Sequence, residues 1–369
     1  MRKLLVIEII LLVLVLAAAA YFIWDISNVQ PNVAPVAPVA AVVTEPTEVT
    51  EPETVPEQTE APEATEPAPT EPEETLRTKD TWAKVLNDHE LTAENYFIYD
   101  LSEDRFLLRS DSADTKIYPA SVTKLFTAYV ALKHAPKDEK ITVGKEIEMI
   151  DVDSSVAKLK VGDVLTVEQL VGGMILPSGN DAAYAIAAGV GRYLAKDPDM
   201  SAKAAVARFV EQMNKDADEL GMTGSHFVTP DGNHADAHYI GLEDLVIVGK
   251  LALENEVIAD YAAQATETIT TANSRSLEWK NTNSLIREAS DYYCEQAIGL
   301  KTGYTTPAGY CLLSVVRIGE RDLLIGVFGS EEKEVRFADT LYLLAQNFRL
   351  DIYEPVSNLP DASVANTAG

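Results

Sequence analysis

The chain has 369 residues, of which 47% are apolar and 24% charged. These are ordinary globular proportions, and they exclude a collagen, a coiled coil and a wholly disordered chain. Lysine and arginine number 30 against 58 acidic residues, a net charge of −28, so we expect no binding to nucleic acid phosphates. Two cysteines, Cys294 and Cys311, are too few for a disulfide framework or a cysteine-rich zinc site.

An apolar segment begins the chain. Arg2 and Lys3 precede an almost unbroken apolar run over residues 4–24, which is typical of an export signal or a membrane span. The alanines at 18–20 suit signal-peptide cleavage, whereas the aromatic residues up to Trp24 suit a retained span. Positive charge before the run and acidic residues after it favour an anchor over residues 1–24, with a cleaved signal peptide as the alternative. Either way, the rest of the chain is expected outside the cytoplasm.

Residues 25–76 are rich in proline, glutamate and threonine. Ten of the 18 prolines lie between residues 30 and 75, a stretch without lysine, arginine or glycine. This composition buries too little apolar surface to offset the entropy cost of ordering, so we expect a disordered, extended spacer. The folded unit is then expected over residues 77–353, followed by a short polar tail over residues 354–369.

Strands are predicted at both ends of the folded unit and helices in its middle. Residues 96–99 and 106–108 flank a polar turn like the two strands of a hairpin. Apolar periodicity predicts helices over 120–134, 166–174, 180–188, 204–220 and 241–253. The end of the unit is predicted as strands over 297–301, 310–318 and 322–328 and a helix over 333–348. This order indicates an α+β domain with an antiparallel sheet.

Ser121 and Lys124 form a Ser-x-x-Lys pattern at the start of the first predicted helix. Two other copies of the pattern lie in polar stretches, whereas this one opens an apolar helix, where unpaired N–H groups favour developing negative charge. Lys124 projects from the same helix face and can act as a base if desolvation and a neighbouring cation lower its pKa. Taken alone, the pattern favours a helix-capping serine followed by a surface lysine.

Two further short motifs carry candidate chemistry. Ser178-Gly-Asn180 lies at a helix entry, where a hydroxyl and an amide can relay a proton and hold a substrate amide. Lys301-Thr302-Gly303 follows a predicted strand and offers a cation, a hydroxyl and a backbone open to close approach, a receptor for a carboxylate. The structural alternatives are an N-capped turn for the first motif and a β-turn for the second.

Together the three motifs resemble the D-alanyl-D-alanine carboxypeptidases, the low-mass penicillin-binding serine peptidases. The resemblance covers about residues 95–353. It is carried by Tyr-Pro-Ala-Ser-Val-Thr-Lys at 118–124, Pro-Ser-Gly-Asn-Asp-Ala-Ala at 177–183, Gly-Met-Thr-Gly-Ser-His-Phe-Val-Thr-Pro-Asp-Gly at 221–232 and Gly-Leu-Lys-Thr-Gly-Tyr-Thr-Thr-Pro-Ala-Gly-Tyr at 299–310. It implies a β-lactamase-like fold with an all-helical lobe, an acyl-enzyme mechanism acting on peptidoglycan stem peptides, inhibition by β-lactams, and no metal or organic cofactor.

The resemblance also implies roles for the site residues. Ser121 would attack the carbonyl of the penultimate D-alanine and Lys124 would take its proton, while Ser178 would pass a proton to the leaving amine. The remaining residues would bind substrate. Asn180 would hold the substrate amide, and the backbone N–H groups of Ser121 and Tyr304 would bind the oxyanion. In the Lys-Thr-Gly303 motif, Lys301 would maintain a positive potential and Thr302 would bind the terminal carboxylate, near which Arg336 would also lie.

The chain departs from the family pattern in two places. Many members have histidine where this chain has Tyr304, which should matter little because only the backbone N–H is invoked. Many also carry a C-terminal β domain and a C-terminal amphipathic anchor, whereas here we expect the spacer and anchor at the N-terminus.

Three other interpretations remain open at this stage. A β-lactamase would need a separate glutamate, and no Glu-x-x-Leu-Asn segment lies between Asn180 and Lys301. A zinc hydrolase would use His234 and His238, but these follow a loop signal and lack an adjacent glutamate. A catalytically idle wall-binding protein would keep the fold without the reaction. For the two cysteines we expect buried free thiols.

Overall fold

The computed structural model of the protein describes residues 75–78, 81–110 and 116–352. The chain divides into two units, Met1–Glu66 and Pro67–Gly369, and all described residues belong to the second. The predicted anchor and tail, and all of the predicted spacer except its last two residues, lie outside the described residues. None of the helices that the described residues form is long and apolar enough to cross a bilayer.

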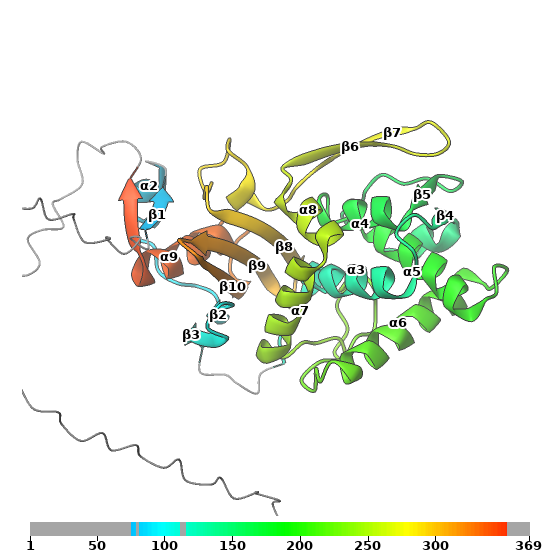
Figure 1. The fold of residues 1–369 in the computed structure, drawn as a ribbon, viewed down its shortest axis with the longest axis horizontal. Coiled ribbons are helices and arrows are strands. Elements are labelled where there is room, and N and C mark those ends of the chain that lie inside the picture. Colours follow the sequence, from blue (N-terminus) through cyan, green and yellow to red (C-terminus); the bar gives the residue numbers. More distant parts are fainter. Residues whose placement is uncertain (1–74, 79–80, 111–115, 353–369) are drawn as a thin grey trace, which may run out of the picture. The chain divides into compact units, whose positions relative to one another are not determined.

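A five-stranded antiparallel sheet lies at the centre of this unit (Figure 1). Its order in space is β3-β2-β10-β9-β8, which places β8 at one edge. The middle of the sheet is the β9–β10 hairpin, in which Leu324 pairs with Val315. The strands are β2 (Asn95–Asp100), β3 (Arg105–Arg109), β8 (Ala297–Thr305), β9 (Gly309–Ile318) and β10 (Arg321–Ser330).

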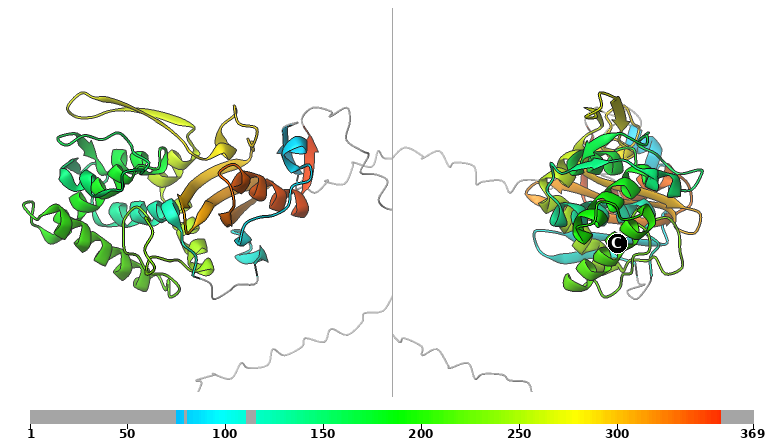
Figure 2. Two further views of the ribbon diagram at one scale, coloured as in Figure 1. Left: turned by 180° about the vertical axis from the view of Figure 1, so that it is seen from behind. Right: turned by 90° about the vertical axis from the view of Figure 1, so that its right-hand side faces the viewer.

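A helical lobe contacts the sheet through α7, α8 and the short 3₁₀ turn η1 that precedes α3 (Figures 1 and 2). Its helices are η1 (Ala120–Val122), α3 (Thr123–His134), η2 (Lys145–Met149), α4 (Val167–Ile175), α5 (Asn180–Ala195), α6 (Ala202–Glu219), α7 (Leu242–Glu254) and α8 (Glu256–Ala263). Two short antiparallel pairs accompany them, β4 (Lys140–Thr142) with β5 (Val164–Thr166) and β6 (Thr266–Thr270) with β7 (Ser276–Lys280).

Alternation along the strands gives the sheet a hydrophobic core on each face. On β10, Leu324 belongs to the core shared with the helical lobe, and its neighbours Leu323 and Ile325 belong to the opposite core. On β2, Phe97 belongs to the core shared with the helical lobe, and Ile98 belongs to the opposite core. Successive side chains of a strand point to opposite faces, so a strand with apolar residues at consecutive positions is buried on both.

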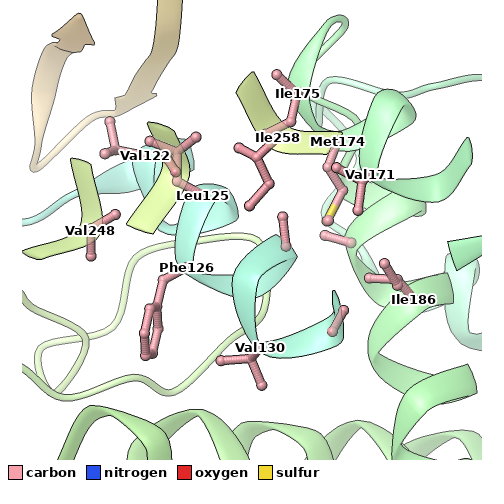
Figure 3. Packing of buried hydrophobic residues seen from close by; sticks show 14 of the residues in the cluster. Val122, Leu125, Phe126, Val130, Val171, Met174, Ile175, Ile186, Val248 and Ile258 are labelled. Atoms are coloured by element: carbon pink, nitrogen blue, oxygen red, sulfur yellow. The ribbon is translucent and has the colours of Figure 1, made fainter. Parts of the chain in front are cut away.

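Helix α3 is the centre of the helical lobe. Figure 3 shows its side chains Leu125, Phe126 and Val130 among apolar residues of α4, α5, α7 and α8. The three are at most 1% exposed, and burying each such side chain stabilises the fold by roughly 1.5–3 kcal/mol. A helix that is buried on nearly every side is a rigid support for the residues at its N-terminus.

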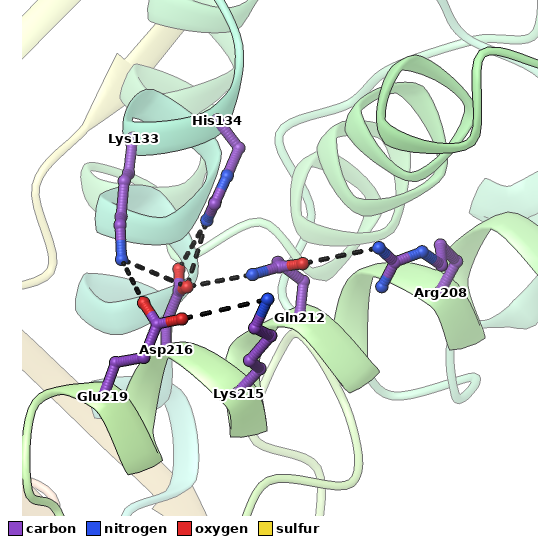
Figure 4. A network of polar contacts seen from close by, with 7 residues as sticks. All are labelled: Lys133, His134, Arg208, Gln212, Lys215, Asp216 and Glu219. Carbon is purple, nitrogen blue, oxygen red and sulfur yellow. Dashed lines mark hydrogen bonds and ion pairs between the residues drawn. The ribbon is translucent and has the colours of Figure 1, made fainter.

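A buried aspartate joins the C-terminal end of α3 to α6 (Figure 4). Asp216 has no exposed side-chain surface and accepts hydrogen bonds from Lys133 Nζ at 3.1 Å and from Gln212 Nε2 at 3.0 Å. His134 Nε2 lies 2.8 Å from the second carboxylate oxygen. These partners offset the cost of burying the carboxylate, so α3 is held at both ends.

The two ends of the described chain meet on the other side of the sheet. α9 (Val335–Asn347) packs against the core opposite the helical lobe, and α2 (Thr81–Leu86) contacts α9. The strand β1 (Thr75–Thr78) pairs in parallel with β11 (Arg349–Ile352). The domain boundary that we predicted at residue 77 therefore falls within β1.

The predicted elements agree with the structure except around one motif. The hairpin, the five middle helices, the last two strands and the final helix are all present, and the α+β class is confirmed. Lys301, predicted at a strand end, lies instead in the middle of β8, which continues to Thr305 because its backbone pairs with β9 as far as Gly309. The sequence analysis did not predict α8 or the β6–β7 hairpin.

Candidate active site

Ser121 lies in the turn η1, directly before the buried helix α3. A hydrogen bond of 2.6 Å joins its Oγ to Nζ of Lys124, one turn further along. The preceding residue, Ala120, has a φ of +47°, a conformation that costs energy for a residue with a Cβ. Surrounding contacts hold this turn, and the serine hydroxyl is thereby presented at a helix N-terminus.

Lys124 is completely buried, and the protein supplies three acceptors for its amine. Besides Ser121, Nζ donates to Asn180 Oδ1 at 2.8 Å and to the backbone oxygen of Asp231 at 2.9 Å. Burial lowers the pKa of Lys124 to about 8, although the carboxylates of Asp231 and Asp181 oppose the shift. The amine is thus poised to lose its proton near neutral pH, as a general base requires.

Ser178 and Asn180 lie where α4 leads into α5. Ser178 is 6% exposed, with a φ of +60°, and Asn180 is the first residue of α5. The Asn180 amide accepts from Lys124 and donates from Nδ2 to Ser154 Oγ at 2.9 Å. Its orientation is therefore fixed, and both motif residues face the same cavity as Ser121.

Lys301, Thr302 and Gly303 lie on β8, the edge strand of the sheet. Lys301 is 1% exposed, and burial, together with the cations Lys124 and Arg336, holds its pKa well below the ordinary value. The hydroxyls of Thr302 and Thr282 are hydrogen bonded at 2.6 Å. The outer edge of a terminal strand is free to pair with an extended peptide.

Gly303 allows β8 to approach the nucleophile. A Cβ at this position would lie 2.9 Å from Pro119 O and 3.0 Å from Ser121 N. Only glycine fits such a contact without displacing η1. Gly303 therefore brings β8 close to the backbone nitrogen of Ser121, and Ser121 and Tyr304, the residue after Gly303, both line the cavity.

Arg336, the second residue of α9, lies behind the same strand. Its Nη1 donates to Gly303 O at 3.0 Å, and its guanidinium lies 5.6 Å from the ring centroid of Tyr310. Tyr310 in turn stacks on the half-exposed ring of Tyr304 at 4.3 Å. Burial lowers the Arg336 pKa to about 10, and Nε has no hydrogen-bond partner among the described residues.

These residues meet around one cavity of about 820 Å³ between the helical lobe and the sheet. Its lining includes seven of the nine residues predicted from the sequence: Ser121, Ser178, Asn180, Thr302, Gly303, Tyr304 and Arg336. The other two, Lys124 and Lys301, are buried beneath the lining. Residues separated by as many as 215 positions in the sequence are therefore brought into a single site.

The loop Thr229-Pro-Asp-Gly is part of the site, although the sequence analysis used it only as a loop signal and as part of the family resemblance, and gave its residues no role in the site. Thr127 Oγ1 donates to Pro230 O at 2.7 Å, which fixes the loop to α3. Gly232 has a φ of +81°, and a Cβ there would lie 1.8 Å from Ala120 O. The Pro-Asp-Gly sequence was the available signal, but it indicated a turn without revealing what the turn contacts.

The structure shows the surroundings of the histidines and cysteines whose roles the sequence did not decide. His238 Nε2 lies 2.9 Å from Thr123 Oγ1, and burial lowers the pKa of this histidine to about 4. His234 packs edge-on against the ring of Tyr118. Within residues 75–78, 81–110 and 116–352 no cluster of three metal-ligating side chains occurs. Both cysteines are free and buried, as predicted.

Comparison with known proteins places this geometry in a family. A sequence profile described as D-alanyl-D-alanine carboxypeptidase matches residues 82–332. The D-alanyl-D-alanine carboxypeptidase of Streptomyces sp. strain K15 is 33% identical over 252 residues, 66% of this chain and 83% of that protein. DacA of Escherichia coli K12 is 32% identical over 279 residues, 73% of this chain but only 64% of DacA.

Solved structures agree with the sequence comparison. The Streptomyces K15 DD-transpeptidase superimposes with a TM-score of 0.61 at 30% identity, covering 69% of this chain and 95% of that one. Penicillin-binding protein D2 from Listeria monocytogenes, solved in the cefotaxime-bound form, gives a TM-score of 0.55 at 26% identity, covering 69% of this chain and 97% of that one. The match of the family profile over two thirds of the chain, together with the hydrogen-bonded pair of Ser121 at the cavity and Lys124 beneath it, shows that the chain belongs to the D-alanyl-D-alanine carboxypeptidase family.

Proposed function

We propose that the chain is a serine D,D-carboxypeptidase that removes the terminal D-alanine from peptidoglycan stem peptides ending in D-Ala-D-Ala. One observation carries the proposal: Ser121 Oγ lies 2.6 Å from the buried Lys124 amine, at a cavity that also presents Ser178, Asn180 and the edge strand β8. This arrangement supplies a nucleophile, a base, a proton relay and a binding edge in one place.

Acylation begins at Ser121. Its Oγ attacks the carbonyl carbon of the penultimate D-alanine, and the uncharged Lys124 amine takes the hydroxyl proton. The backbone N–H groups of Ser121 and Tyr304 bind the developing oxyanion, and the close approach of Gly303 to Ser121 N supports this assignment. Preorganised donors of this kind are usually a large part of the rate acceleration.

The leaving group is protonated from the helical-lobe side of the cavity. Ser178 relays the proton from Lys124 to the nitrogen of the departing D-alanine, and the amide of Asn180, fixed by its two hydrogen bonds, binds the backbone of the substrate. The bond between the carbonyl carbon and the nitrogen breaks, and free D-alanine leaves. The acyl group remains on Ser121 as an ester.

The terminal carboxylate of the substrate is recognised by the β8 side. Thr302 offers a hydroxyl, and the buried cations Lys301 and Arg336 give this end of the cavity a positive potential. Burial lowers the pKa of both cations, and repulsion from Lys124 and Arg336 lowers that of Lys301 further. An arriving carboxylate relieves this repulsion, so binding of an anion at this end is favoured.

A fluorescent penicillin and a D-Ala-D-Ala peptide test the function. We expect a covalent adduct on Ser121 and release of D-alanine, both abolished in Ser121→Ala. A β-lactamase would instead turn over penicillin rapidly, and an idle wall-binding protein would form no adduct. Either result would refute the carboxypeptidase.

We further propose that the protein acts outside the cytoplasm, anchored by residues 1–24. The charge pattern around this apolar run supports the proposal. Mass determination of the mature N-terminus in the membrane fraction tests it, because an intact residue 1 is expected for an anchor and a new N-terminus near residue 20 for a cleaved signal peptide.

A further inference from the structure

Asp231 is a buried carboxylate beside the nucleophile, and the acylation steps give it no role. The residue is 2% exposed and lines the cavity. Its backbone oxygen accepts from Lys124 Nζ at 2.9 Å, and this nitrogen is itself 2.6 Å from Ser121 Oγ. The tight packing of Gly232 against Ala120 O leaves the loop no freedom to move away. Asp231 is thus fixed close to the reacting atoms.

Comparison with Asp181 shows what is unusual about this carboxylate. Asp181 is buried too, but both of its oxygens accept backbone N–H groups, those of Ala157 at 2.7 Å and Leu159 at 2.9 Å. It is a structural residue that fixes a loop to α5. In Asp231, Oδ1 accepts the N–H of Asn233 at 3.0 Å, and Oδ2 has no hydrogen-bond partner among the described residues. Asp231 lines the cavity, so this oxygen is open to a hydrogen-bond partner from within it.

We propose that Asp231 Oδ2 binds and orients the water that hydrolyses the acyl-enzyme, an inference that rests on the proposed carboxypeptidase function. One hydrogen of the water is held by Oδ2, and the oxygen attacks the carbonyl carbon of the ester on Ser121. The other proton passes to Lys124 and from there to Ser121 Oγ as the bond between this oxygen and the acyl carbon breaks. The product leaves as a shortened peptide with a free carboxyl group, and the enzyme is regenerated.

This role predicts opposite effects on the two half-reactions. Acylation needs an uncharged Lys124, and the negative charge of Asp231 raises the pKa of this lysine. Removal of the charge therefore leaves acylation at neutral pH undiminished or faster. Deacylation loses the group that holds the water and becomes slower. General damage to the site would slow both steps, so the split distinguishes a catalytic from a structural role.

The test compares Asp231→Asn with a matched control, Asp153→Asn. Asp153 lines the same cavity, but it is exposed and is not among the carboxylates that act on Lys124. The rate of Ser121 acylation by a fluorescent penicillin and the lifetime of the adduct are measured for the full-length protein. For D231N we expect an acylation rate at least equal to that of the unmodified protein and an adduct lifetime at least about tenfold longer. D153N should change neither.

An unchanged adduct lifetime in D231N, or an equal loss in both steps, would overturn the proposal. Asp231→Ser is the second variant, because serine is also a good turn residue and keeps the backbone oxygen that Lys124 uses. If D231N does not fold, Asp231→Ser should show the same undiminished acylation rate and the same longer adduct lifetime. If the unmodified protein forms no adduct at all, the carboxypeptidase function itself fails, and this result is distinct from an unchanged lifetime.

Discussion

At the scale of single residues, the buried amine of Lys124 determines the chemistry. An exposed lysine keeps its proton at neutral pH, but burial brings the pKa of Lys124 to about 8. Roughly a tenth of the molecules then carry an uncharged amine at pH 7. The cost of burying the amine is offset by its hydrogen bonds to Ser121, Asn180 and Asp231 O.

The pH dependence of acylation should report this titration. The base form of Lys124 is the unprotonated one, so the acylation rate should rise about tenfold per pH unit below pH 8 and level off above it. Stopped-flow labelling of Ser121 with a penicillin at pH 6 to 9 measures the profile. A flat profile across this range would contradict the assignment of Lys124 as base.

Substitution of the base gives a second prediction. Lys124→Ala should lower the acylation rate at least about a hundredfold while the protein remains folded, because the lysine contributes catalysis more than core volume. Penicillin labelling and circular dichroism measure the two properties. Lys158→Ala is the control: this lysine belongs to another Ser-x-x-Lys sequence but is exposed. Undiminished labelling of K124A would refute the role.

The residues of the site divide into those that the sequence could reveal and those that it could not. Ser121, Ser178 and Lys301 lie in short motifs whose chemistry is readable from residue type and spacing. Asp231 lies in a turn sequence, and its nearness to Lys124 arises from packing between segments 107 positions apart. No local pattern encodes such a contact.

At the scale of elements, the loop that ends at Gly232 shows how backbone shape builds the site. Gly232 combines a positive φ with a contact that leaves no space for a side chain. Gly162 has a similar φ of +91°, but a Cβ there would meet nothing within 4 Å. Substitutions at the two glycines therefore distinguish the energetic cost of backbone strain from that of steric exclusion.

This pair gives a third prediction. Gly232→Ala should destabilise the fold by roughly 2–4 kcal/mol and lower acylation, because the loop must withdraw from Ala120 and carry the Asp231 oxygen away from Lys124. Gly162→Ala should cost only the strain of about 1 kcal/mol and leave acylation unchanged. Urea unfolding and penicillin labelling measure both. Equal losses in the two variants would show that the contact with Ala120 contributes nothing.

The elements missed from the sequence have identifiable physical reasons. Helix α8 has only eight residues and follows α7 with Asn255 alone between them, so the two helices form one apolar stretch in the sequence. The side chain of Asn255 caps α8 by accepting from Val257 N and Ile258 N. β8 continues past Lys301 because β9 pairs with it, a tertiary effect that strand propensity does not contain.

At the scale of the whole molecule, the sheet separates the core shared with the helical lobe from a second core, to which α2 and α9 contribute. Trp82 of α2 is 2% exposed and shares this core with Leu285 and Cys294. Its Nε1 donates to Tyr293 O at 2.9 Å. Leu285 lies between Ser284 and Arg287, which line the active-site cavity, so α2 supports one wall of the site from behind.

A fourth prediction follows from this support. Trp82→Phe keeps most of the apolar surface but removes the indole N–H, and it should raise the KM for a D-Ala-D-Ala peptide more than it lowers kcat, with about 1–2 kcal/mol of lost stability. Leu344→Val, a change in the same core at a residue that does not line the cavity and has no cavity-lining residue beside it in the sequence, is the control for stability alone. Steady-state kinetics measure KM and kcat, and urea unfolding measures the stability. The same KM change in both variants would argue against specific support of the wall.

The parallel pairing of β1 with β11 has a mechanical consequence. Thr75 lies beside Arg349 and Thr78 beside Ile352, so the strand by which the chain enters the domain is bonded along its length to the last strand. A pull on the chain before Thr75 acts along the axis of β1 and loads all of these hydrogen bonds together in shear. A pair of strands whose hydrogen bonds are loaded together resists tension better than one whose bonds open one after another.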